Sequence, residues 1–128
     1  MDTQAPLRPV RDLRDLLAWQ LSVDLVEQVY RRTREFPVDE RFGLRQQLRR
    51  SAVSISSNIA EGHGRASRRD YAYHVSVAVG SLKELETQLE IAARLEFLAR
   101  QDLDAMEPLI RRTNGLLVGL RKRLRAPS

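Results

Sequence analysis

The chain of 128 residues contains no cysteine, five prolines, six glycines and few aromatic residues. The absence of cysteine excludes disulfides, thiolate metal sites and a cysteine nucleophile. So few prolines and glycines leave room for long regular elements. No apolar run approaches the ~20 residues that span a bilayer, and the N-terminus lacks the basic-then-apolar layout of a signal peptide. We therefore expect one cytoplasmic domain with no membrane partner.

Positive charge is what the sequence has in excess. The net charge is +5, and 20 of the 22 basic residues are arginine. The excess lies in residues 38–66, with a net charge of +2, and in residues 101–128, with +3. Such a balance is compatible with a nucleic-acid partner. It is equally compatible with an arginine-rich composition that binds no nucleic acid.

Apolar residues recur at three- and four-residue steps in four segments, and no segment alternates with a period of two. The segments cover about 12–36, 39–62, 67–95 and 102–125, with short turns between them. The expected seams of the last three segments are Leu48, Ala52, Ile55 and Ile59; Tyr71, Val75, Ala78, Leu82, Leu85, Leu89 and Ala92; and Leu103, Met106, Ile110, Thr113, Leu117, Leu120 and Leu124. This pattern predicts an all-α protein, an antiparallel up-and-down four-helix bundle over residues 12–125. Residues 1–11 are expected to form a flexible segment, and residues 126–128 a short tail. Pro108 predicts a late start or a mild kink in the fourth helix.

The first helical segment carries two apolar rows instead of one. Its seam is expected to run through Leu16, Trp19, Val23, Val26, Tyr30 and Thr33. A second row makes the apolar face wider than one partner helix requires. We expect it to lie, together with Trp19, at the interface of a homo-oligomer, although it could instead fill the core. The second row consists of Leu17, Leu21, Leu25 and Val29.

Residues 54–65, SISSNIAEGHGR, combine an Asn, a Glu, a His and a Gly-x-Gly-Arg. A phosphate loop requires a preceding strand, whereas here a helix precedes the glycines. The stretch therefore predicts a helix end with Gly62 or Gly64 in left-handed geometry, followed by a capping box, Ser67-x-x-Asp, that opens the third helix. A polar row beside the core leads us to expect partly buried, hydrogen-bonded Asn58 and Glu61. We therefore expect a structural role, and not a chemical one, for the residues that we call the structural signature: Asn58, Glu61, Gly62, Gly64 and Arg65.

The sequence offers no convincing catalytic or metal-binding constellation. His63 follows the helix in a turn, and no His-x-x-x-His or Glu-x-x-His pair supports a metal site. Glu84, Glu86 and Glu90 lack the Glu-x-x-His helices of a di-iron bundle. No serine pairs with a positioned histidine. We therefore expect a protein that is not an enzyme and that holds no metal or cofactor.

Two arginine-rich stretches are the stronger functional candidates. In one reading they contact the phosphates of RNA or DNA, with strong salt dependence and weak sequence specificity. In the other they form a solvated face and complement helix dipoles, and the protein is a scaffold for another protein. Aromatic residues do not interleave with them, so base stacking has little support. The candidates are Arg41, Arg45, Arg49 and Arg50, and Arg111, Arg112, Arg121, Lys122, Arg123 and Arg125.

Landmarks spread along the chain resemble those of a known family. They are Asp12-Leu13, Trp19-Gln20, Tyr30, Phe36-Pro37, Glu40-Arg-Phe-Gly-Leu44, Gln47-Leu-Arg-Arg50, Ser54-Ile55, Ser57-Asn-Ile-Ala-Glu-Gly62, Gly64-Arg65 and Gly80-Ser-Leu-Lys-Glu-Leu-Glu86. The chain is similar to the bacterial four-helix bundle proteins first described from intervening sequences of 23S ribosomal RNA genes. That resemblance implies a ring of five bundles. The chain is also similar to the accessory variability protein of diversity-generating retroelements, which implies nucleic acid and a reverse transcriptase as partners, with arginines on a positive surface or pore.

Overall fold

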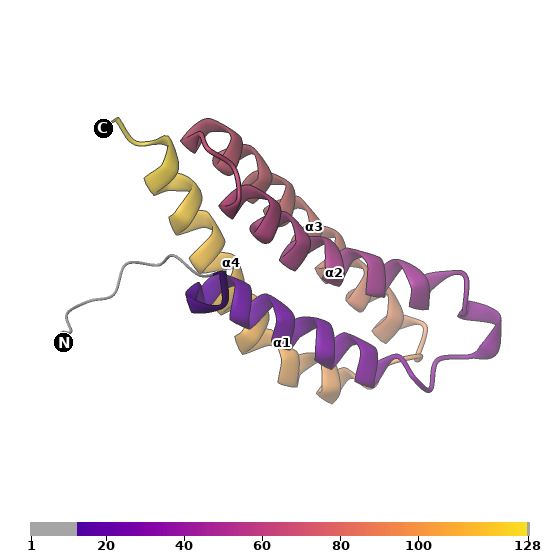
Figure 1. Ribbon diagram of the computed structural model, residues 1–128. Coiled ribbons are helices and arrows are strands. Elements are labelled where there is room, and N and C mark those ends of the chain that lie inside the picture. Colours follow the sequence, from indigo (N-terminus) through magenta and orange to yellow (C-terminus); the bar gives the residue numbers. More distant parts are fainter. Residues whose placement is uncertain (1–12, 128) are drawn as a thin grey trace, which may run out of the picture.

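The computed structural model describes residues 13–127, and these residues form helices joined by short turns, with no strand (Figure 1). The connections α1–α2 and α3–α4 lie at one end of the bundle. The α2–α3 turn lies at the other end, beside the end of α4 (Figure 1). The antiparallel up-and-down four-helix bundle is therefore confirmed. The elements are η1 Leu13–Asp15, α1 Leu17–Arg32, η2 Val38–Glu40, α2 Leu44–His63, α3 Arg68–Arg94 and α4 Arg100–Arg125.

The core follows the expected apolar seams of α2, α3 and α4. In α2 the four seam residues, Leu48, Ala52, Ile55 and Ile59, are fully buried. The corresponding side chains of the other two helices pack against them in one cluster. Burial of this contiguous apolar surface is the main force that holds the bundle together. The buried seam residues of α3 and α4 are Val75, Ala78, Leu82, Leu85, Leu89, Ala92, Leu103, Met106, Ile110, Thr113 and Leu117.

Helix α1 turns a different face to the core than the sequence predicts. Leu21, Leu25 and Val29 are 8%, 0% and 0% exposed, so they fill the core of one chain. Small neighbours on the same face, Ala18 and Ser22, are also buried and let the other helices approach closely. The prediction that Leu21, Leu25 and Val29 lie at an oligomer interface is therefore wrong.

The two other residues of that predicted interface remain at the surface or near it. Leu17 is 39% exposed at the start of α1. Trp19 is half-buried and packs against the core cluster. The row that was expected to be the seam borders the core: Leu16 and Val26 are half-buried against the core cluster, Thr33 is fully buried, and Tyr30 is exposed.

Several helix ends differ from the sequence prediction. Helix α1 begins at Leu17, after Leu16 as N-cap and without a side-chain cap, later than the predicted start near residue 12. Helix α2 begins at Leu44 because Val38–Glu40 forms a 3-10 turn instead, and Glu40 Oε1 accepts the Leu44 N–H at 2.9 Å. Helix α4 starts at Arg100 and continues through Pro108, so the predicted late start is wrong.

Candidate nucleic-acid interface

The structure divides the ten candidate basic residues into three groups. The first, which we call the α2 group, consists of Arg41, just before α2, and Arg45, Arg49 and Arg50 in its first two turns. Arg111 and Arg112 are exposed on the middle of α4. The C-terminal group lies at the opposite end of the bundle from the α2 group. Because α2 has 20 residues, the two ends are about 30 Å apart. The C-terminal group comprises Arg121, Lys122, Arg123 and Arg125.

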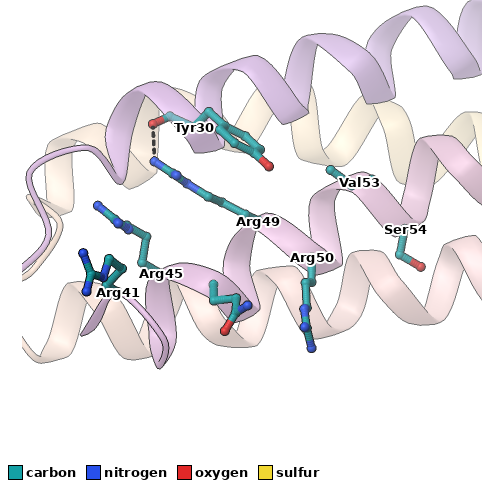
Figure 2. Close-up of a pocket in the computed structure, with 8 residues that line it drawn as sticks. Tyr30, Arg41, Arg45, Arg49, Arg50, Val53 and Ser54 are labelled. Atoms are coloured by element: carbon teal, nitrogen blue, oxygen red, sulfur yellow. Dashed lines mark hydrogen bonds between the residues drawn. The ribbon is translucent and has the colours of Figure 1, made fainter. Parts of the chain in front are cut away.

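The α2 group surrounds an open pocket of about 460 Å³ between α1 and α2 (Figure 2). Tyr30 supplies the wall on the α1 side, and Val53 and Ser54 lie farther along α2. Arg41 and Arg45 lie at the end of the pocket near the α1–α2 loop, whereas Arg50 extends away from the Tyr30 ring (Figure 2).

Within the α2 group, the side chain of Arg49 contacts residues of α1 and its C-terminal end. Its Nε–H donates to Thr33 Oγ1 at 2.9 Å, and a terminal nitrogen donates to the Tyr30 carbonyl at 3.3 Å. Its guanidinium also lies 4.3 Å from the centroid of the Tyr30 ring. These contacts join α1 to α2 across 16 or more residues of sequence. We therefore assign Arg49 mainly to the packing of these two helices.

Two side chains of the C-terminal group, those of Arg121 and Arg125, hydrogen-bond to a neutral acceptor. A guanidinium nitrogen of Arg125 lies 3.2 Å from Ser76 Oγ, and one of Arg121 lies 3.5 Å from the same oxygen. In return, α3 contributes Arg68, which donates to the Arg123 carbonyl at 2.6 Å. None of these contacts neutralises the positive charge, because neither a hydroxyl nor a carbonyl is anionic.

Arg68 and Arg69 belong to the same surface, although the sequence candidates do not include them. They open α3 beside the last turn of α4 and line a hollow of about 550 Å³ with Tyr73 and Arg125. In residues 61–70 and 118–127 together there are seven basic and two acidic side chains. The sequence hides this excess because residues 67–100 are neutral as a whole. An up-and-down topology places residues 61–70 and 118–127 at the same end of the bundle, so the predicted topology could have revealed this shared positive surface.

Several arginines elsewhere in the bundle are paired with carboxylates. Arg100 and Arg94 bind Glu90 at 2.7 Å and 2.9 Å, and Arg32 pairs with Asp102 at 3.1 Å. The hydrogen bond from Arg100, and then the one from Arg94, lower the pKa of Glu90 to about 2. Within residues 13–127, no ion pair involves a member of the α2 group or the C-terminal group. The two groups thus differ from the paired arginines in having no carboxylate partner.

The residues of the structural signature lie at the end of α2 and in the turn that follows it. Asn58 is half-buried, as predicted; its amide nitrogen donates to the Ser54 carbonyl at 2.9 Å, and its Oδ1 lies 3.2 Å from His74 Nδ1. Glu61 is not buried: it is exposed and pairs with Arg65 at 2.7 Å. The expectation of a partly buried Glu61 is wrong because its position faces solvent one turn before the helix ends.

The glycines of the signature serve a purpose other than the predicted one. In the described chain no glycine has a positive φ, and Gly64 caps α2 at φ −83°. Gly62 is instead buried where α2 meets α3: an added Cβ would lie 2.8 Å from Tyr71 Cδ1 and 2.9 Å from His74 Cβ. The Ser67 cap is confirmed, because its Oγ accepts the Asp70 N–H at 3.0 Å.

Other kinds of site find no support in the part of the chain that the structure describes. No group of three or more histidine, aspartate or glutamate side chains is placed to hold a metal ion there. No helix among residues 13–127 is long and apolar enough to cross a membrane.

Comparisons with known proteins agree on the fold. The family model described as 23S rRNA-intervening sequence protein matches residues 14–119. A solved structure from Bacteroides thetaiotaomicron, a protein of unknown function from the S23 ribosomal protein family, superposes with a TM-score of 0.77 at 24% identity. The match covers 85% of this chain and 98% of that one. No curated protein matches in sequence.

Proposed function

The chain belongs to the family of 23S rRNA-intervening sequence proteins, and we propose that it is a non-enzymatic, oligomeric helical bundle that binds RNA or DNA through arginine contacts to phosphate. The observation that carries this proposal is the C-terminal group with Arg68 and Arg69. Within this surface, hydroxyl and carbonyl oxygens position the side chains of Arg68, Arg121 and Arg125, and these neutral acceptors leave the positive charges able to attract an anion.

Phosphate backbones suit this surface better than a single small anion does. The basic side chains are spread over the start of α3 and the last turns of α4, and all of them except Arg123 line two adjoining hollows that share Arg125. A polyanion can contact several of them at once and release one condensed counterion for each contact. The proposal therefore implies affinity that falls steeply with salt and depends little on sequence.

A salt titration of labelled RNA with the full-length protein tests the proposal. In the test variant, glutamine replaces Arg121, Lys122, Arg123 and Arg125. If all four contact phosphates, the slope of log affinity against log salt should fall by about 3–4, since each contact contributes roughly 0.7–0.9. Affinity should also fall at every salt concentration.

A control variant loses the same charge elsewhere. Glutamine replaces the exposed residues Lys83, Arg31, Arg34 and Arg94, which lie outside both basic groups. This variant should keep most of the slope of the parent protein. If the two variants lose equal affinity, net charge alone controls binding and the proposed interface is wrong. If the parent binds no RNA or DNA at low salt, the arginines only solvate the surface, and the protein is better explained as a scaffold for another protein.

A further inference from the structure

We propose that the surface formed by the C-terminal group with Arg68 and Arg69 binds single-stranded nucleic acid in preference to duplex. An unpaired base would stack on the exposed ring of Tyr73, which lies within this surface. The inference rests on the proposed function and adds the kind of strand that the site selects. The sequence alone argues against stacking at this end of the bundle, because no aromatic residue lies within the arginine-rich stretch of residues 111–125. The fold changes this by placing α3 beside the end of α4.

Tyr73 is exposed within the basic surface. Its side chain is 64% exposed. It lines the hollow of about 550 Å³ with Arg68, Arg69 and Arg125, and the floor includes Ala72 and Leu124. A hollow of this size is within the usual range for small-ligand sites, about 300–1,000 Å³, so it accommodates a nucleotide.

In the described part of the chain no arginine covers the Tyr73 ring, in contrast to the rings of Tyr30 and Phe42. The Tyr30 ring is covered by Arg49 at 4.3 Å, and the Phe42 ring by Arg41 at 4.8 Å. The Tyr73 ring instead contacts His74, in a T-shaped arrangement with 5.2 Å between centroids and 78° between planes. His74 is itself held by Asn58 of α2.

Stacking on Tyr73 requires a base whose face is free. In a duplex both faces of each base are already stacked, whereas a single strand can turn a base onto an aromatic ring while its phosphates contact arginines. Arg125 is shared with the adjoining hollow of about 440 Å³, which is also lined by Arg121 and Lys122. A strand that stacks a base at Tyr73 can therefore continue across these positive charges.

Fluorescence anisotropy with three probes of equal length tests the inference. The probes are an oligothymidylate of about 16 nucleotides, a strand without bases and a duplex. The parent protein should bind the oligothymidylate most tightly. Tyr73→Ala should weaken this binding by about ten-fold, or roughly 1.4 kcal/mol, and leave binding of the other two probes unchanged. Tyr73→Phe should retain the affinity, because the ring is preserved.

Phe42→Ala is the matched control, since Phe42 is 76% exposed beside Arg41 at the other end of the bundle. It should bind all three probes like the parent protein. Equal affinity of the parent for the strands with and without bases overturns the inference, as does an unchanged Tyr73→Ala; either result leaves salt-dependent phosphate binding intact. Absence of binding to every probe at low salt overturns the proposed function as well. A melting temperature for each variant verifies that the bundle is folded.

Discussion

Gly62 illustrates how a single residue can be identified correctly and explained wrongly from sequence. A glycine after a helical run predicts a left-handed cap, and the turn does follow two residues later. Its actual importance comes from α3, because the Tyr71 ring and the His74 Cβ occupy the space beside its Cα. This close approach depends on how two helices cross, which no local pattern encodes. Asn58 is half-buried as predicted and hydrogen-bonds to His74 of α3, whereas Glu61, predicted from the same polar row, is exposed beyond the reach of that helix contact.

Replacing two helical glycines with alanine should give stability changes of opposite sign. Gly62→Ala should lower the free energy of unfolding by about 1–3 kcal/mol, since its Cβ would require Tyr71 and α3 to shift. Gly80→Ala is the control: Gly80 is exposed on α3 with nothing within 4 Å of an added Cβ. It should raise stability by about 0.5–1 kcal/mol, because alanine favours a helix interior.

Urea unfolding followed by circular dichroism measures both changes. A Gly62→Ala variant as stable as the parent would mean that α2 and α3 do not approach as closely as described. A loss of stability in both variants would point instead to a general cost of changing glycines in these helices.

At the scale of the element, α1 is where prediction from sequence was least successful. Two adjacent apolar rows each fit the helical period, so periodicity cannot decide which of them faces inward. The buried small residues Ala18 and Ser22 select the row of Leu21, Leu25 and Val29, because they allow neighbouring helices to approach. Helices α2, α3 and α4 each have one dominant seam, and their buried faces were predicted correctly.

The junction between α3 and α4 should make stability depend on acidic pH through Glu90. Its carboxylate accepts hydrogen bonds from Arg100 and Arg94, which lower its pKa from the usual 4.5 to about 2. A carboxyl group with a lowered pKa in the folded state stabilises it above the unfolded pKa. That contribution is lost as the pH falls from about 4.5 to about 2. Glu90→Gln should therefore show a smaller decrease in melting temperature over this range than the parent protein.

Glu107→Gln is the matched control for this titration. Glu107 is exposed on α4 and forms no ion pair among residues 13–127. Its variant should follow the parent curve. If Glu90→Gln also follows that curve, the pairs with Arg94 and Arg100 do not persist in solution.

For the whole molecule, the sequence predicts the bundle but not the positive surface at its end. Four seams and short turns are enough to specify antiparallel neighbours. The charge of a segment, however, is a sum along the chain, whereas a partner responds to charge in space. Arg69 and Tyr73 belong to a neutral segment, yet they lie beside Arg125. Candidate residues should therefore be chosen after the helices are arranged, even when the arrangement itself comes from sequence.

The size of the assembly is the last prediction at this scale. We expect light scattering of the purified protein to give a mass that is a multiple of 14.7 kDa, with a ring of five as the form that the sequence resemblance implies. Leu17 is the exposed apolar residue that remains of the predicted interface, at 39% exposure. Leu17→Lys should lower the mass, because a lysine buried between subunits would lose its hydration.

Ile91→Lys provides a control of matched exposure, since Ile91 is 42% exposed on α3. It should leave the mass unchanged. A monomeric parent protein would remove the oligomer from the proposed function, yet the C-terminal group and Tyr73 would still lie together within one chain. The proposed interface is complete in a monomer. If Leu17→Lys prevents assembly, each chain should therefore keep its own affinity for RNA, and only the gain from several linked sites should be lost. A Leu17→Lys monomer that binds no RNA at low salt would place the interface between subunits instead.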